Sequence, residues 1–458
     1  MDTLGKLDIL AEAARYDAAC TSSGAQRDAK PGKLGMASPA GCCHSFTPDG
    51  RCVTLLKVLM SNACSYDCAY CVNRRQAACP RATFEPRELA ELTVDFYKRN
   101  FIEGLFLSSG VLGTPDATTE RMVECLRILR DDLRFNGYVH SKVIPGTSPA
   151  LVDALGRLSD RLSVNLELPS ASSLSRLCPE KDRSAVLQPM AQIHSMRTQE
   201  EHALLQSGKG RNGNRTRRLP SPEREGLSLG AWGARLTMRP HSPIGPRTRS
   251  FAPAGQSTQL IIGATPEDDN HILQLSNALY QRFDLKRIFF SAYMPMVEDH
   301  NLPARETPVP LRREHRLYQA DWLMRYYDFS PDELATPNEP WLDLDIDPKL
   351  AWALRHIDRF PVEVMSASLQ ELLRVPGVGP VGARRILAAR RQGPLSFDDL
   401  GKLHVTLKRA RHFITCNGTR DASCPLDAEL IRRRVVSDAK QSRYNATRRA
   451  VEGQLTLF

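Results

Sequence analysis

Short apolar runs alternate with amphipathic stretches between residues 53 and 294. The apolar runs are typical of buried strands and cover 53–60, 104–109, 138–144, 161–169, 257–265 and 286–294. Helical patterns stand between most of them, at 85–100, 116–133, 148–158 and 266–283. Strands that alternate with helices pair in parallel through right-handed crossovers. The pattern predicts an α/β fold with six parallel strands, two units short of a closed eight-stranded barrel.

The rest of the chain divides into segments of different composition. Residues 1–52 form an N-terminal extension that contains cysteines, and 53–330 form the predicted barrel, with a last outer helix at 315–329. Within the barrel, residues 207–250 are rich in Gly, Pro, Ser and Arg, which predicts a basic, flexible insertion. A small helical domain is expected at 350–415, followed by a flexible tail at 416–458.

Composition and charge exclude several classes of protein. The 458 residues are enough for two or three globular domains. The composition is that of an ordinary globular chain, which excludes disorder throughout and collagen-like order. No apolar run approaches the roughly 18 residues of a membrane span, and charges interrupt the start where a signal peptide is apolar. We therefore expect a cytoplasmic protein with no membrane partner. The net charge of +10 favours a polyanionic partner.

Twelve cysteines in a reducing compartment point to metal or radical chemistry rather than to disulfides. Cys64, Cys68 and Cys71 follow the first predicted strand with the spacing C-x3-C-x2-C. Three thiolates on a short loop can bind three irons of a [4Fe-4S] cubane and leave the fourth iron without a protein ligand. The alternative is a structural cluster or a zinc site, but no second C-x2-C pair follows at zinc-ribbon distance.

This loop resembles the radical S-adenosylmethionine superfamily. The resemblance implies that the open iron binds the amino and carboxylate groups of S-adenosylmethionine. One electron from the reduced cluster, supplied by a donor such as flavodoxin or ferredoxin, then releases a 5'-deoxyadenosyl radical that takes a hydrogen atom from substrate. It also implies a set of cofactor-binding residues, for which strand-end packing is the alternative: Tyr70 near the adenine, then Ser108, Ser109, Gly110, Asn165, Glu167 and Gly263.

The family pattern is incomplete at two of these places. Ser108, Ser109 and Gly110 stand where the family has a Gly-Gly-Glu-Pro turn, so contact through the backbone is the expectation. Gly263 matches a fifth-strand glycine motif whose first glycine is replaced by Gln259.

The remaining early cysteines are candidates for a second iron–sulfur cluster. Its ligands would be Cys20, Cys43, Cys52 and Cys79. The alternative for each is a buried cysteine that acts as a small hydrophobic residue.

The stretch 369–391 predicts two helices joined by the turn Val-Pro-Gly-Val-Gly, and it resembles the helix-hairpin-helix DNA-binding motif. Gly377 and Gly379 let the backbone approach a phosphate, and Arg384 and Arg385 add positive charge. Residues 396–414 look like a degenerate repeat that has lost the glycines. Backbone contacts of this kind predict weak sequence specificity and strong salt dependence. The alternative is a hairpin that only packs against the barrel.

The last residues resemble the short peptide by which bacterial repair proteins bind the sliding clamp. The residues that carry this resemblance are Gln454, Leu455, Leu457 and Phe458. A flexible tail that inserts an apolar anchor into a pocket is a common recognition mode.

Together, these segments resemble one branch of the superfamily, the radical S-adenosylmethionine proteins assigned to DNA modification or repair, over most of residues 5–418. The resemblance implies a partial parallel (β/α)6 radical SAM barrel with a small all-α helix-hairpin-helix domain at the C-terminus. The expected activity is radical chemistry on DNA, at a damaged or extruded nucleotide. Two alternatives stay open: a radical enzyme that modifies RNA such as a tRNA base, and a non-catalytic iron–sulfur redox sensor that binds DNA. No catalytic acid or base can be named.

Overall fold

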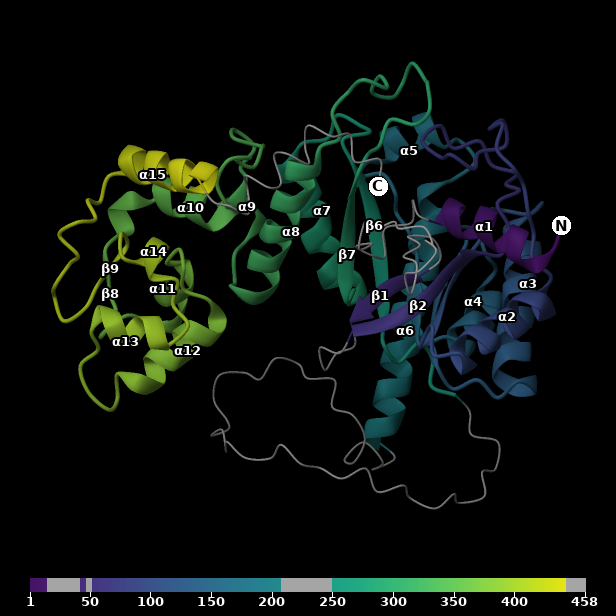
Figure 1. Cartoon of the computed structure of the whole chain (residues 1–458), viewed down its shortest axis with the longest axis horizontal. Coiled ribbons are helices and arrows are strands. Elements are labelled where there is room, and N and C mark those ends of the chain that lie inside the picture. The colour runs from purple at the N-terminus through teal and green to yellow at the C-terminus, as the bar shows by residue number, and fades with distance from the viewer. Residues whose placement is uncertain (15–41, 47–51, 207–248, 442–458) are drawn as a thin grey trace, which may run out of the picture. The chain divides into compact units, whose positions relative to one another are not determined.

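The computed structural model describes residues 1–14, 42–46, 52–206 and 249–441 (Figure 1). Contacts divide the chain into two compact units. The first unit comprises residues 1–67, 72–165 and 180–258, and the second comprises 68–71, 166–179 and 259–458.

One sheet with the strands in sequence order, β1 to β7, organises the α/β fold. The strands are β1 (Cys42–Phe46), β2 (Cys52–Leu59), β3 (Gly104–Ser108), β4 (Tyr138–Lys142), β5 (Arg161–Ser163), β6 (Gln256–Ile262) and β7 (Arg287–Ala292). Register is parallel from β2 through β6, and β7 follows β6 in the order. The prediction of an α/β fold with six parallel strands is confirmed. The sequence pattern missed β1, which pairs with β2 in antiparallel fashion.

In the first unit, one face of the sheet is apolar and faces helices. This face carries fully buried side chains, which include Leu56, Leu105, Leu107, Val139 and Leu162. The helices of this unit that follow β2 are α2 (Pro86–Lys98), α3 (Pro115–Arg127) with the π-helical turn Ile128–Asp132, α4 (Pro149–Leu158) and α6 (Arg183–Gln206). Gln256 shares the apolar face, and its amide donates to the carbonyl oxygen of Met190 in α6 (3.1 Å). Burial on this face holds the sheet against the helices.

Two elements differ from the sequence pattern for local reasons. The predicted strand at 161–169 is regular only at Arg161–Ser163. Glu167 has a positive φ of 63°, which an extended strand does not allow, and forms only an isolated bridge with Leu260. The predicted helix at 116–133 changes to a π-helical turn at Ile128, so one long helix is interrupted.

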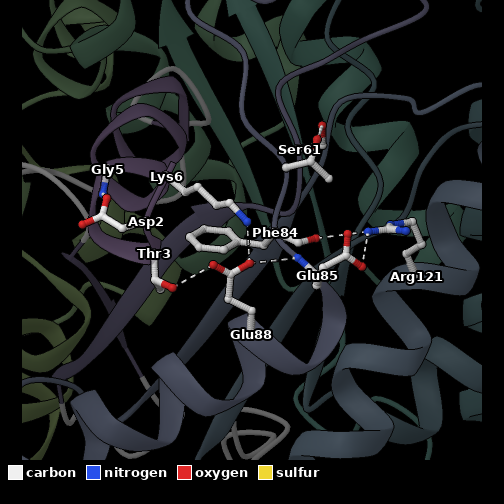
Figure 2. Close-up of polar contacts among 10 residues, drawn as sticks. Asp2, Thr3, Gly5, Lys6, Ser61, Phe84, Glu85, Glu88 and Arg121 are labelled. Atoms are coloured by element: carbon white, nitrogen blue, oxygen red, sulfur yellow. Dashed lines mark hydrogen bonds and ion pairs between the residues drawn. The ribbon is translucent and has the colours of Figure 1, made fainter.

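The N-terminal helix α1 (Thr3–Ala13), which the sequence pattern did not predict, packs on the first unit through buried Leu10. Figure 2 shows its polar contacts: the Lys6 Nζ lies 2.7 Å from Glu88 Oε2, and the Thr3 hydroxyl donates to Glu88 Oε1 (2.8 Å). Burial raises the pKa of Glu88, but the hydrogen bonds from Lys6 and Thr3 outweigh it, so the pKa lies below its usual value. Glu88 of α2 therefore anchors α1.

The second unit is mainly helical. Its helices are α5 (Ala171–Leu177), α7 (Asp269–Phe283), α8 (Leu311–Tyr326), α9 (Pro331–Leu334), α10 (Pro348–Arg355), α11 (Leu369–Arg374), α12 (Pro380–Ala389), α13 (Phe397–Lys402), α14 (Leu407–Ala410) and α15 (Ala428–Gln441), with the short 3₁₀ turn Ile357–Arg359. Two short strands, β8 (Val362–Glu363) and β9 (Ile414–Thr415), pair in parallel.

Two clusters hold these helices together. Asp269 is 1% exposed, binds the Arg313 guanidinium (2.7 Å) and accepts the Leu342 amide (2.9 Å). Trp352 is fully buried against the rings of Phe329 and Phe360. A buried carboxylate needs such partners to offset its desolvation.

The predicted boundaries at 1–52, 53–330 and 350–415 stay predictions. The predicted insertion lies almost wholly outside the described residues, and so do Gln454, Leu455, Leu457 and Phe458 of the clamp-like peptide. Within the described part of the chain, no helix combines the length and the apolar character that crossing a bilayer requires.

We predict that Glu88→Gln weakens the docking of α1 and lowers the free energy of unfolding by about 1 kcal/mol at neutral pH, because a charge-assisted contact is lost. Since the folded-state pKa of Glu88 is lowered, its contribution is fully present above the unfolded pKa and is lost as the pH falls through the folded value. Urea unfolding of both proteins from neutral to acidic pH measures this. A difference that does not shrink with acid would contradict the assignment.

Candidate metal and cofactor site

The loop that carries the three-cysteine motif passes from one unit to the other. Cys64 belongs to the first unit, and Cys68 and Cys71 belong to the second.

In the first unit, backbone amides surround the sulfur of Cys64. Its Sγ accepts hydrogen bonds from the amides of Tyr66 (3.4 Å) and Val111 (3.3 Å). The turn after β3 lies against it, since the Gly110 amide donates to the Ser61 carbonyl oxygen (2.7 Å). A Cβ added at Gly110 would be 3.2 Å from Cys64 Cβ, so this position favours glycine. Amide hydrogen bonds to sulfur stabilise a thiolate and tune the potential of a cluster bound through it.

The structure thus places the predicted turn residues next to one predicted ligand. Ser108 is 1% exposed at the end of β3, and the Ser109 hydroxyl donates to the Gly110 carbonyl oxygen (2.7 Å). The Ser65 amide donates to the carbonyl oxygen of Val111 (2.7 Å), which joins the cysteine loop to this turn.

In the second unit, the sulfur of Cys68 contacts a cysteine that the sequence did not single out. Cys68 Sγ lies 2.8 Å from Sγ of Cys178, which directly follows α5, and both side chains are buried. The Ala69 amide donates to the Leu177 carbonyl oxygen (2.8 Å) and fixes the loop on this helix. Two thiolates on one tetrahedral metal lie about 3.7 Å apart, since metal–sulfur bonds measure about 2.3 Å. The contact is therefore shorter than a shared metal ion allows.

Cys71 and Tyr70 lie at the partly exposed end of the same loop. The Cys71 amide donates to the Cys68 carbonyl oxygen (2.9 Å), which closes a tight turn between the two cysteines. This turn presents the thiol of Cys71 and the ring of Tyr70 on one short segment.

The donor set fits an iron–sulfur cluster in its chemistry. Three thiols stand on one loop, and amide donors orient the first of them. In the described residues, however, no group of three or more His, Cys, Asp or Glu side chains is gathered closely enough to hold a metal ion. The thiols are of the kind that an iron–sulfur cluster requires, but the described residues do not gather three of them around one position.

The second face of the sheet in the first unit is buried and carries polar side chains beside apolar ones. Partners in parallel register point to the same face, and one such row joins Lys57, Phe106, His140 and Arg161. Lys57 Nζ lies 5.9 Å from the centroid of the Phe106 ring, which packs edge-to-face on His140 at 4.4 Å. Lys57 and His140 are 7% and 3% exposed. This face therefore carries Lys57 and His140 where a sheet core is normally apolar.

The next row along the strands lies at their carboxyl ends. It contains Ser108, Lys142, Ser163 and Ser257, and Asn165 follows just beyond β5. Ligands of open parallel sheets bind at these carboxyl ends. The two rows could bind an anionic or strongly polar ligand, such as a carboxylate or a phosphate.

Lys57 and His140 were missed as site residues by the sequence analysis. The available signal was Lys57, the single charged residue of the predicted strand 53–60, whereas His140 shares its strand with Ser141 and Lys142. Strand periodicity puts such residues on the face opposite to the helix-packed one.

The predicted residues of the second unit have structural partners of their own. Gly263 has a φ of 86°, and a Cβ there would lie 2.7 Å from Pro310 Cγ, so packing alone requires this glycine. Glu167 is buried and exchanges backbone hydrogen bonds with the segment 259–261. The nearby carboxylate of Glu267 accepts hydrogen bonds from the hydroxyls of Ser170 and Ser173. Burial raises the pKa of Glu267, but these hydrogen bonds lower it overall.

The candidate second cluster stays untested. Cys79 is partly exposed in the first unit. Cys43 and Cys52 lie on the paired strands β1 and β2, where only the backbone is described. Cys20 lies outside the described residues.

Around the glycine turn, residues 375–379 connect α11 to α12. Gly377 has a φ of 87°, and a Cβ there would lie 2.6 Å from the carbonyl oxygen of Thr406, whose amide donates to the Gly377 carbonyl oxygen (2.9 Å). The close approach at Gly377 is thus to the following helical repeat. Gly379 is the N-cap of α12, and no side chain caps this helix.

The arginines of this region fall into two groups. Arg374, Arg390, Arg409 and Arg411 bind carbonyl or carboxylate oxygens of the protein. Arg384 and Arg385 are exposed on α12, and neither side chain forms a hydrogen bond or ion pair with a described residue. The two predicted arginines are therefore available to a ligand.

A buried lysine, Lys349, contacts the turn 375–379. Lys349 is 7% exposed, donates to the Val378 carbonyl oxygen (2.5 Å) and lies 4.7 Å from the centroid of the Tyr327 ring. Burial lowers the pKa of Lys349 to about 7, although nearby Asp347 acts in the opposite direction. The Lys349 amine thus donates to the backbone of the turn 375–379 rather than to a ligand in solvent.

Comparison with known proteins gives structural likeness at a low level. No protein-family model matches the sequence, and no curated protein matches it either. Among solved structures, the FeFe-hydrogenase maturase HydG from Carboxydothermus hydrogenoformans is similar with 10% identity and a TM-score of 0.36, over 58% of this chain and 50% of that chain. A second structure of HydG, a maturase of the [FeFe]-hydrogenase, has 12% identity and a TM-score of 0.36 over 86% of this chain and 81% of that one. The chain spans half the length of the first, and likeness at this level carries no argument about function.

Proposed function

We propose that this protein is a radical S-adenosylmethionine enzyme that acts on DNA in modification or repair. The single observation that carries the enzymatic part is the environment of Cys64, whose sulfur accepts two amide hydrogen bonds beside the turn that follows β3. When bound, a reduced [4Fe-4S] cluster supplies the electron that cleaves S-adenosylmethionine.

The residues of this chain would hold and orient the reactants. Cys64, Cys68 and Cys71 would bind three irons and leave one for the cofactor. The turn at Ser109 and Gly110, which already contacts Cys64, would offer backbone groups to the methionine moiety. Lys57, which is buried on the second face of the sheet and precedes this loop in the chain, would attract a carboxylate or phosphate.

The DNA part of the proposal rests on the C-terminal helices. The N-terminus of α12 has no capping side chain, which leaves backbone amides for a phosphate. Arg384 and Arg385 on the same helix are exposed and unpaired among the described residues. Contacts of this type hold the nucleic-acid backbone without reading its sequence.

We predict that the anaerobically reconstituted protein forms 5'-deoxyadenosine from S-adenosylmethionine and a strong reductant, and that Cys68→Ala does not. With only two of its three cysteine ligands, the protein should not retain a cluster with an open iron. The amount of product should therefore fall at least a hundredfold, which corresponds to about 2.7 kcal/mol in activation free energy at 1.36 kcal/mol per factor of ten. Product is measured by mass spectrometry, and iron and sulfide are measured on the same samples.

Cys125→Ala is the matched control for this experiment. Burial raises the pKa of the Cys125 thiol to about 12, so it is an inert core residue. The control should retain iron and product. Wild-type protein that binds iron but never yields 5'-deoxyadenosine would contradict the enzymatic proposal and favour a redox sensor.

We predict that replacing Arg384 and Arg385 together by alanine lowers the affinity for DNA about tenfold. It should also make the slope of log K against log salt shallower by about 2. Each arginine that contacts a phosphate releases about one counterion on binding, and the variant lacks two such contacts. Fluorescence anisotropy at several salt concentrations measures both quantities.

A double alanine variant at Lys98 and Arg99, exposed cations at the end of α2, removes the same charge from the first unit. It should leave the slope unchanged. Equal effects of the two double variants would mean that net charge, and not the hairpin, binds DNA.

A further inference from the structure

A pair of aromatic side chains, exposed Trp322 and half-buried Tyr326, lies at the end of α8. Trp322 is 53% exposed, and its ring centroid lies 4.2 Å from that of Tyr326 with an angle of 45° between the planes. A tryptophan that leaves half of its surface in water loses a large hydrophobic contribution, so such a residue is often part of a binding surface. The functions proposed above do not use this pair.

The pair lies at the end of α8 that contacts the glycine turn 375–379. Tyr327 directly follows α8, and its hydroxyl lies 3.4 Å from the Cβ position of Gly379, the N-cap of α12. The end of α8 that carries Trp322 and Tyr326 is therefore next to the start of α12.

Further contacts make this arrangement rigid. The Arg374 guanidinium, at the end of α11, donates to the carbonyl oxygens of Tyr327 and Asp328 (2.8 Å each) and binds Glu333 (2.9 Å). Lys349 lies against the Tyr327 ring on one side and holds the Val378 carbonyl oxygen on the other. The end of α8 and the hairpin turn thus share their supporting side chains.

The surroundings favour a nucleic-acid base over an apolar partner. On α12, Arg384 and Arg385 are exposed with no partner among the residues described, and the first turn carries Val381, which is 56% exposed. Aromatic rings next to a basic, phosphate-binding surface are the combination that binds unpaired nucleotides, because each base has a face that stacks and each phosphate has a charge.

We propose that Trp322, supported by Tyr326, stacks on an unpaired base of the strand whose phosphates the hairpin binds. The substrate class is then DNA with a single-stranded or extruded nucleotide rather than a fully paired duplex. This inference rests on the proposed DNA-binding function of the same domain. It adds a residue that recognises the base and a preference between DNA structures, neither of which the hairpin alone supplies.

The test uses the full-length protein and three fluorescent DNAs of equal length: a single strand, a matched duplex and a duplex with one unpaired base. Wild-type protein should bind the single strand and the unpaired-base duplex about tenfold more tightly than the matched duplex. Trp322→Ala should remove this preference and leave the affinity for the matched duplex unchanged. Trp322→Phe, which keeps an aromatic ring, should retain most of it.

Trp341→Ala is the matched control, because Trp341 is 56% exposed and therefore as accessible as Trp322. The centroid of its ring lies 4.7 Å from the guanidinium of Arg313. It should keep the preference. Thermal unfolding of each variant reports whether the fold is intact. We expect it to be intact because the rings of Trp322 and Trp341 are both half exposed.

The outcomes separate the two proposals. If Trp322→Ala keeps the preference, or loses no more of it than Trp341→Ala does, base stacking is overturned while DNA binding stands. If wild-type protein binds all three DNAs equally, base stacking is likewise overturned. If it binds none of them at low salt, the DNA-binding function fails, and the inference fails with it.

Discussion

Parallel register between neighbouring strands is the constraint on which the candidate site depends. It places every second residue of β2 to β5 on one face, and the helices cover the face that is rich in leucine and valine. The other face is left with Lys57 and His140, both almost fully buried. Burying such groups costs free energy, and the ring of Phe106, which contacts both side chains, offsets part of that cost.

Much of the fold could be predicted because its signals are local. Apolar runs located the six parallel strands, and the spacing of the cysteines located the loop after β2. The strand at 161–169 was predicted too long, because the positive φ at Glu167 is set by its bridge to Leu260 and not by its own type. The helix α1 was missed because the contacts of Lys6 and Glu88 join positions far apart in the chain.

The candidate site could be predicted only in part, for the same physical reason. Gly110 was expected near the cofactor, and its packing on Cys64 follows from the turn after β3. The contact between Cys68 and Cys178 has no sequence signal, since 109 residues separate the two and only the docking of α5 on the loop brings them together. Gly263 shows the opposite case, in which Pro310 accounts for a residue that also matches a family motif.

Gly377 and Thr406 constrain each other in the helical part of the second unit. The Thr406 amide donates to the Gly377 carbonyl oxygen, and the Thr406 carbonyl oxygen leaves no room for a side chain at Gly377. His404, with a φ of 66°, stands where a glycine would be easier to accommodate, and its carbonyl oxygen in turn packs on Gly382 of α12. The backbone of the turn 375–379 therefore depends on the backbone at 404–406, so a substitution that moves either segment also moves the other.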